Sequence, residues 1–182
     1  MRPIVAAAIA AVLTLAGCSD DEETPMPTPV AMTEDAIGHY CGMNVLEHPG
    51  PKGQIMLGPN PEPVWFSSAR DLVAFTMLPE EAKNISALYV SDMAKAASWE
   101  SPGANNWVEA RRAFYVIGSS MRGGMGAPET VPFSSEVAAV AFTDRNGGEV
   151  VRFADIPPDY VLGTDDVPVD DGPSPQPSEP TH

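Results

Sequence analysis

A cysteine flanked by two other metal-binding side chains stands in the segment 39–43, which reads His-Tyr-Cys-Gly-Met. If this segment is extended, alternate side chains face the same way, so His39, Cys41 and Met43 project from one face. An imidazole, a thiolate and a thioether at this spacing form a partial cage for a soft metal ion, and Cu(I) suits this donor set. Gly42 adds no side chain beside the thiol and lets a partner approach closely.

The second cysteine, Cys18, ends an apolar N-terminal segment. Arg2 supplies a positive charge, and the apolar run 4–15 that follows is shorter than the about 20 residues that a spanning helix needs. The ending Leu-Ala-Gly-Cys is typical of bacterial lipoprotein precursors, whereas an ordinary cleaved signal or an uncleaved anchor is the alternative. We therefore predict a lipoprotein signal peptide over 1–17 and lipidation at Cys18, which leaves Cys41 without a disulfide partner and makes a closed zinc site improbable.

The composition is strongly acidic. The 182 residues carry 25 Asp and Glu against 10 Lys and Arg, for a formal net charge of -15. This charge argues against a nucleic-acid partner, since phosphate binding needs a basic surface. It also disfavours electrostatic docking to anionic lipid, so membrane attachment is expected through the covalent anchor.

Proline and acidic residues mark both ends of the chain. Residues 18–35 and 155–182 are rich in both, and the second of these segments has no Lys or Arg after Asp155. We predict a lipidated, disordered tether over 18–35 and a disordered acidic tail over 155–182. The folded body is then expected over 36–154.

An internal repeat organises this body. Residues 64–76 align with residues 131–143 at a constant offset, sharing Val, Phe, Ser, Ser, Val, Ala, Phe and Thr. Ser67 and Ser134 suit helix N-caps, and Gly147 suits the end of the second helix. We predict an α+β fold of two tandem β-β-α-β modules packed as one domain, with chance similarity of two amphipathic helices as the alternative. The expected strands cover 39–44, 54–57, 64–66, 85–90, 110–117 and 150–153.

A glycine-rich loop follows the predicted strand 110–117 and carries two methionines, Met121 and Met125. Core methionines sit among apolar neighbours, which these two lack, so a functional loop and a plain flexible hairpin stay equally open. The pattern lacks the Lys-Ser/Thr ending of a phosphate-binding loop.

Signatures of enzymes are absent from the sequence. It contains neither a Gly-x-Ser-x-Gly nor a His-Glu-x-x-His motif. A nucleophile pair of Cys41 and His39 would have no third group in view to orient it. We therefore expect the protein not to be an enzyme.

Several motifs together resemble the NosL family, the accessory lipoprotein of nitrous oxide reductase. They are Cys-Gly-Met at 41–43, Glu-His-Pro-Gly-Pro-Lys-Gly-Gln at 47–54, Ala-Phe-Tyr-Val-Ile-Gly-Ser at 113–119, Gly-Met-Gly at 124–126 and Pro-Phe at 132–133. The resemblance covers the Leu-Ala-Gly-Cys segment at 15–18, the lipobox, and nearly all of the predicted body over 36–154. It implies paired β-β-α-β units similar to those of organomercurial lyase, in agreement with the repeat.

The resemblance also implies a ligand set. Cu(I) binding in the family centres on the Cys-x-Met motif, here Cys41 and Met43, with help from the methionine of the later loop, here Met125. This chain has Gly124 where the family commonly has proline, which implies a looser loop. His39 is added as a ligand only on the strand geometry described above.

The implied function is that of a Cu(I) metallochaperone, anchored by lipid and facing the periplasm, which delivers copper for maturation of nitrous oxide reductase through an ABC-type complex. Residue 19 is Ser rather than Asp, so no inner-membrane retention signal is evident and the outer membrane is expected. The alternatives are an organomercurial-lyase-like or thiol-dependent enzyme, and a lipoprotein scaffold that binds no metal.

Overall fold

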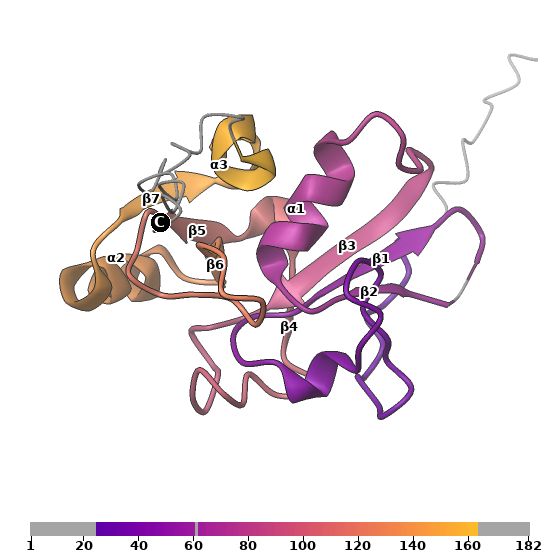
Figure 1. Ribbon diagram of the computed structural model, residues 1–182, viewed down its shortest axis with the longest axis horizontal. Helices are drawn as coiled ribbons and strands as arrows, with labels where there is room; N and C mark the ends of the chain where they lie inside the picture. Colours follow the sequence, from indigo (N-terminus) through magenta and orange to yellow (C-terminus); the bar gives the residue numbers. More distant parts are fainter. Residues whose placement is uncertain (1–24, 61, 164–182) are drawn as a thin grey trace, which may run out of the picture.

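The computed structural model describes residues 25–60 and 62–163 (Figure 1). The predicted signal peptide, Cys18, and the outer parts of the predicted tether and tail lie outside these residues. No helix in the described part is long and apolar enough to cross a membrane.

Within these residues, two antiparallel sheets and three α-helices make up the fold (Figure 1). The four-stranded sheet has the order β2-β1-β3-β4, and the three-stranded sheet has the order β6-β5-β7. The strands are β1 (Gly53–Leu57), β2 (Val64–Phe66), β3 (Ile85–Ser91), β4 (Trp107–Glu109), β5 (Phe114–Ile117), β6 (Val131–Phe133) and β7 (Glu149–Arg152). The helices are α1 (Ala69–Met77), α2 (Glu136–Asn146) and α3 (Pro158–Leu162), with 3-10 turns at Val45–Glu47, Ala110–Arg112 and Phe153–Asp155.

The predicted duplication is confirmed by the sheet pairing. In each module the first strand is central: β1 lies between β2 and β3, and β5 lies between β6 and β7. Gly53 of β1 pairs with Phe66, and Phe114 of β5 pairs with Phe133, the residue equivalent to Phe66 in the repeat. A helix joins the second and third strands in both modules, so the β-β-α-β order holds twice.

The helix ends follow the expected chemistry with one shift. The N-caps are Ser68 and Ser135, one residue after those predicted, and their hydroxyls accept from the backbone N–H of Asp71 (3.0 Å) and Ala138 (3.4 Å). Because both Ser residues of each Ser-Ser pair can cap, the sequence did not distinguish them. Gly147 ends α2 with a φ of 71°, as predicted.

Two predicted strands are wrong: residues 39–44 form no strand, and the predicted strand 110–117 is wrong in its N-terminal part. Residues 39–41 form a turn, and only an isolated bridge between Ile37 and Asn44 joins the two arms of this segment. In the predicted strand 110–117, the first three residues form a 3-10 turn, and the strand begins at Phe114. The hydroxyl of buried Tyr115 donates to the carbonyl of Ala110 (2.8 Å), which stabilises that turn.

The ordered structure begins before the predicted limit at residue 36. The side-chain amide of buried Gln54 in β1 pairs with both backbone groups of Val30 at 2.9 Å, and Tyr89 donates its hydroxyl to the carbonyl of Pro27 (2.6 Å). Met32, in the predicted tether, is buried. The inner part of the tether is thus bound to the sheet because it satisfies polar groups that the core leaves unpaired.

The structure also continues past the predicted limit at residue 154. Helix α3 packs against α1, and the guanidinium Nε of Arg70 donates to the carbonyl of Val161 (2.9 Å). Val161 is buried in the main core, so this short helix is part of the fold.

The main hydrophobic core lies between α1 and the four-stranded sheet and extends to Tyr115 of β5 and Val161 of α3. A smaller core around Val131, Phe133 and Ala139 lies under α2. The modules therefore keep separate cores, although the larger one takes side chains from both.

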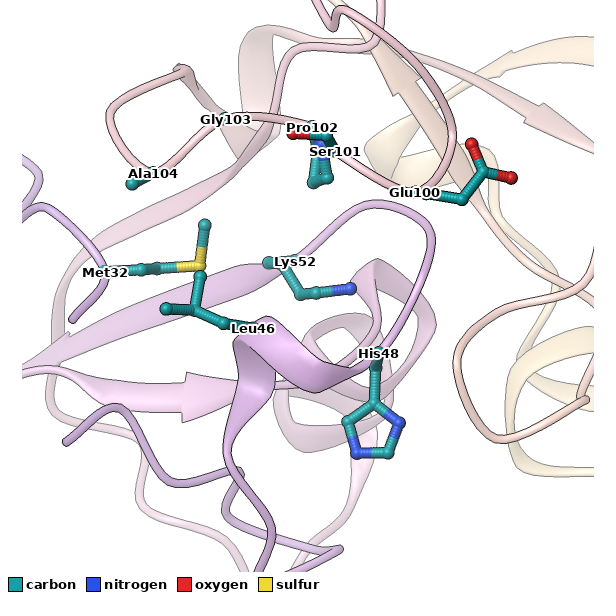
Figure 2. A pocket seen from close by; sticks show the side chains of 9 residues that line it. All are labelled: Met32, Leu46, His48, Lys52, Glu100, Ser101, Pro102, Gly103 and Ala104. Carbon is teal, nitrogen blue, oxygen red and sulfur yellow. The ribbon is translucent and has the colours of Figure 1, made fainter. Parts of the chain in front are cut away.

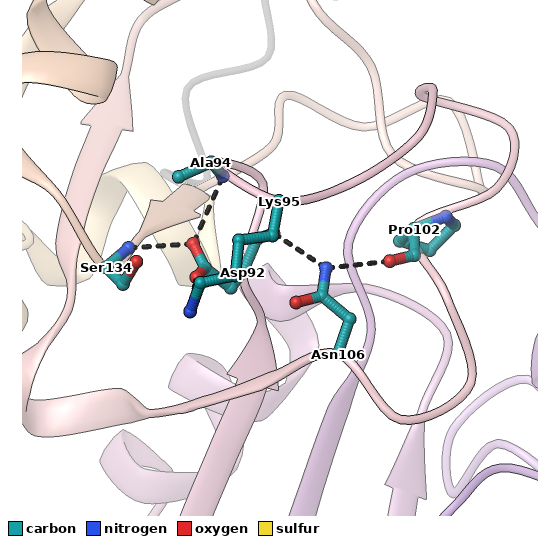
Figure 3. Close-up of polar contacts among 6 residues, drawn as sticks. All are labelled: Asp92, Ala94, Lys95, Pro102, Asn106 and Ser134. Atoms are coloured by element: carbon teal, nitrogen blue, oxygen red, sulfur yellow. Dashed lines mark hydrogen bonds and ion pairs between the residues drawn. The ribbon is translucent and has the colours of Figure 1, made fainter.

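Reciprocal carboxylates join the modules. Buried Asp92, after β3, accepts from the backbone N–H of Ser134 before α2 (2.9 Å) and from Ala94 (3.1 Å), as Figure 3 shows. Buried Glu129, before β6, accepts from the backbone N–H of Arg70 in α1 (2.8 Å). Each module thus supplies the acceptor at the start of the other module's helix, where backbone N–H groups have no partner within the helix.

Candidate metal-binding site

Cys41 lies at the tip of a short irregular hairpin. The backbone N–H of Gly38 donates to the carbonyl of Met43 (2.9 Å), and that of Gly42 donates to the carbonyl of Gly38 (2.9 Å). Gly42 has a φ of +66°, a conformation that glycine adopts without a steric penalty. The site is therefore a closed turn, and alternation along a strand does not place its side chains.

The thiol of Cys41 sits against the backbone of this turn. Its Sγ lies 3.9 Å from the carbonyl oxygen of Met43, and a Cβ added at Gly38 would come within 2.6 Å of the sulfur. Cys41 is a free cysteine of intermediate exposure, and the Met43 side chain is 39% exposed. Both sulfur atoms belong to side chains that solvent reaches, so an incoming ion needs no opening of the core.

The prediction that His39 shares a strand face with Cys41 is wrong, because the His39 side chain points to the segment after α1. Its Nε2 lies 3.3 Å from Glu81 Oε1, and the hydroxyl of Tyr40 donates to the same oxygen (2.8 Å). The His39 ring also packs edge-on against Phe66 and Phe75, with centroids 5.9 and 5.5 Å apart. Nδ1 is the ring nitrogen that Glu81 does not engage.

Met125 lies on a tight loop that abuts the chain following the Cys41 turn. The N–H of Gly126 donates to the carbonyl of Gly123 (2.9 Å), and the Met125 side chain is 56% exposed. A Cβ at Gly124 would come within 2.5 Å of His48 Cβ, so the loop lies directly against His48. Proline at this position would meet the same obstacle unless His48 shifts. Met121 is half-buried.

Buried Lys52 is a feature of the site region that sequence reasoning missed. Its Nζ donates to the carbonyls of Pro49 (3.0 Å) and Gly50 (2.7 Å), so the turn Pro-Gly-Pro-Lys wraps around its own lysine. Burial lowers the pKa of Lys52 to about 8, against the opposing effects of Glu129 and Cys41. The position of Lys52 directly before a buried strand was the sequence signal that could have predicted its burial.

A cavity of about 220 Å³ adjoins this lysine (Figure 2). Met32 and Leu46 line one part of it, and Lys52 and His48 line another, as Figure 2 shows. In the described part of the chain, no three His, Cys, Asp or Glu side chains are grouped so as to hold a metal ion. The sulfur donors on this turn are Cys41 and Met43, and a thiolate and a thioether suit a soft ion.

We predict that Glu81 positions the Cys41 turn. The change Glu81→Ala removes the acceptor that His39 and Tyr40 share, so the turn loses its tie to the segment after α1. One hydrogen-bond network of this kind contributes on the order of 1 kcal/mol, and Cu(I) affinity is expected to fall about fivefold. Competition with a chromophoric Cu(I) chelator measures this change.

The matched control for this prediction is Glu80→Ala, one residue away and exposed. Equal affinities for the two variants would contradict the positioning role of Glu81.

A second prediction concerns pH. Burial raises the pKa of Glu129 to about 8 from 4.5, although hydrogen bonds from Arg70 and Thr130 oppose the shift. Between these values the folded protein keeps a proton that the unfolded chain has released, so the stability from this group is complete at low pH and is lost as pH rises to 8. Glu129→Gln, which stays neutral, should match the wild type at pH 5 and exceed its unfolding free energy at pH 8 by on the order of 2 kcal/mol.

Urea unfolding at several pH values tests this expectation, with exposed Glu149→Gln as the control. Lys52 changes its proton binding above this window, because its pKa moves from 10.5 down to about 8. Parallel pH profiles for the wild type and Glu129→Gln would rule the prediction out.

Comparisons with known proteins agree on one family. The sequence model of the NosL family matches residues 29–161. The copper-binding lipoprotein NosL of Achromobacter cycloclastes is 48% identical over 174 residues, covering 95% of this chain and 86% of the relative. The copper-binding lipoprotein NosL of Stutzerimonas stutzeri is 35% identical over 143 residues, covering 78% and 73%.

A solved structure has the same fold. The crystal structure of the copper chaperone NosL from Shewanella denitrificans superposes with a TM-score of 0.68 at 35% identity, covering 72% of this chain and 97% of that one. The α+β fold predicted from the repeat is therefore confirmed.

Proposed function

The chain belongs to the NosL family, and from that premise we propose that it is a Cu(I) metallochaperone. The observation that carries the proposal is a free thiol on the half-buried Cys41 beside the exposed Met43, both on one turn. A thiolate and a thioether are donors that Cu(I) prefers.

Copper is the cargo, and the turn is suited to hand it on. Two sulfur ligands on an exposed turn leave the ion open on its solvent side, where an acceptor ligand can bind before the first bonds break. Met125 and the Nδ1 atom of His39 are candidates for a further ligand. Both side chains are exposed; His39 belongs to the turn, and the loop of Met125 lies against His48, which follows it. The thiolate is the binding form, so affinity falls as pH drops.

The acceptor in this proposal is the maturation pathway of the copper centres of nitrous oxide reductase, reached through an ABC-type complex. The protein acts on the periplasmic side, held at the outer membrane by lipid on Cys18. The family membership and the lipobox support this assignment, which makes the protein a carrier rather than an enzyme.

X-ray absorption spectroscopy of the purified protein loaded with Cu(I) tests the proposal. The expected result is one ion per chain with sulfur scatterers in its inner sphere. Failure to retain copper after desalting would favour a metal-free scaffold, and turnover of an organomercurial substrate would favour an enzyme.

A further inference from the structure

We propose that the hairpin of residues 34–47 is a docking surface for a partner protein whose contact face is apolar and rimmed by Lys or Arg. The inference rests on the proposed function, because the same hairpin carries Cys41 at its tip.

Large apolar side chains gather on this hairpin although it faces solvent. Ile37 is 50% exposed, Tyr40 45%, Met43 39% and Leu46 43%. These four residues lie within ten positions of the chain that include Cys41, whereas single exposed apolar residues are ordinary on protein surfaces. The exposed apolar area is thus concentrated where copper would be transferred.

The hairpin is also preformed. Backbone hydrogen bonds close it from Val45 N–H to the carbonyl of Ala36 (2.9 Å) and from Gly38 N–H to the carbonyl of Met43 (2.9 Å). Binding to a surface that is already ordered costs less conformational entropy than ordering a loop on contact. The exposed side chains are therefore held in place before a partner arrives.

Charge identifies the partner's chemistry. Glu34, Asp35 and Glu47 are exposed, and none of them has an ion-pair partner in the part of the chain that the structure describes. The hairpin contains no Lys or Arg. A hollow of about 390 Å³ is lined by Glu34, Asn44, Leu46 and Glu47, so two carboxylates flank an apolar wall. The aliphatic stem and charged head of a Lys or Arg match this lining.

Other occupants fit this charge pattern less well. A second copy of the chain packed about a two-fold axis would set the same three carboxylates against one another. An anionic membrane surface would repel them. A cationic rim on a partner protein instead lowers the electrostatic energy and speeds encounter.

The test compares two charge-reversed proteins. In the first, Glu34→Lys, Asp35→Lys and Glu47→Lys are combined. The measured quantity is the rate of Cu(I) transfer from the purified lipidated chain in detergent to the purified ABC-type complex, at low and high salt. At low salt we expect transfer at least about tenfold slower than for the wild type, while Cu(I) affinity of the isolated protein stays unchanged.

The matched control combines Asp144→Lys, Glu149→Lys and Asp155→Lys, an equal change of charge at exposed positions of the other module. The control should transfer at close to the wild-type rate. A third protein, Leu46→Ser, tests the apolar part without changing charge and should also slow transfer.

Equal rates for the hairpin variant and the control would overturn the docking surface while leaving copper binding, and hence the proposed function, intact. Loss of Cu(I) affinity in the hairpin variant would also overturn the docking surface, because the three carboxylates would then serve copper binding rather than partner binding. A hairpin-dependent dimer, or hairpin-dependent sedimentation with vesicles of anionic lipid, would assign the surface to another occupant. A wild-type protein that binds no Cu(I) would remove the proposed function, and this inference with it.

Discussion

Replacing Cys41 by serine is expected to lower Cu(I) affinity at least about a thousandfold, equivalent to roughly 4 kcal/mol. The hydroxyl is nearly isosteric with the thiol, so the turn keeps its backbone bonds and its glycine contacts. What is lost is the single anionic sulfur, because a serine hydroxyl stays protonated and is a hard ligand that Cu(I) binds poorly. Competition titration with a Cu(I) chelator measures the change directly.

The methionines provide a graded comparison for this result. Met43→Leu should cost about tenfold, since a neutral thioether contributes less than a thiolate. Met26, 50% exposed but remote in sequence from the turn, is the matched control, and Met26→Leu should leave affinity unchanged. An affinity for Cys41→Ser within threefold of the wild type would remove Cys41 from the site.

Local sequence signals predicted the modules well. The strand 64–66, the starts of both helices and the end of α2 depend on side chains close in sequence: a short apolar run, a Ser-Ser pair, and Gly147. The duplication added independent support, because the same signals recur at one offset in Val131–Phe133 and α2. Such features are encoded within about a dozen residues, and sequence patterns report them directly.

The residues proposed for the candidate site stay a prediction, whereas the strand geometry predicted for them is wrong. Cys41 and Met43 follow from chemistry, but their strand was an assumption, and the positive φ of Gly42 closes a turn there instead. Glycine beside the thiol was the signal for a turn, which we interpreted only as space for a partner.

Polar contacts between residues far apart in the sequence were beyond sequence reasoning. Glu81 meets His39 from 42 residues away, and Glu129 meets the N–H of Arg70 from 59 residues away. Pairings of this kind are set by how the modules pack, and no local pattern marks them. The binding of residues 25–35 through Gln54 has the same cause, and for that reason the predicted tether extended too far.

Phe66→Ala is expected to have the largest effect on stability, lowering the unfolding free energy by about 3–5 kcal/mol, because it leaves a cavity in the main core. Phe66 is buried and packs against Phe75 at a centroid distance of 5.5 Å, and it also contacts the His39 and Tyr40 rings of the turn at 5.9 and 5.8 Å. Its loss should therefore weaken Cu(I) binding about fivefold in addition. Urea unfolding and chelator competition measure the two effects.

The internal repeat supplies the control for this experiment. Phe133 occupies the equivalent position, is also buried, and packs on Phe142 at 5.2 Å in the other core, away from the turn. Phe133→Ala should cost similar stability and leave Cu(I) affinity unchanged. If the alanine variants do not fold, Phe66→Leu and Phe133→Leu keep the comparison at a cost of roughly 1–1.5 kcal/mol each. Equal losses of Cu(I) affinity in the Phe66 and Phe133 variants would show that lower stability of the whole fold, rather than the packing of Phe66 against His39 and Tyr40, controls the site.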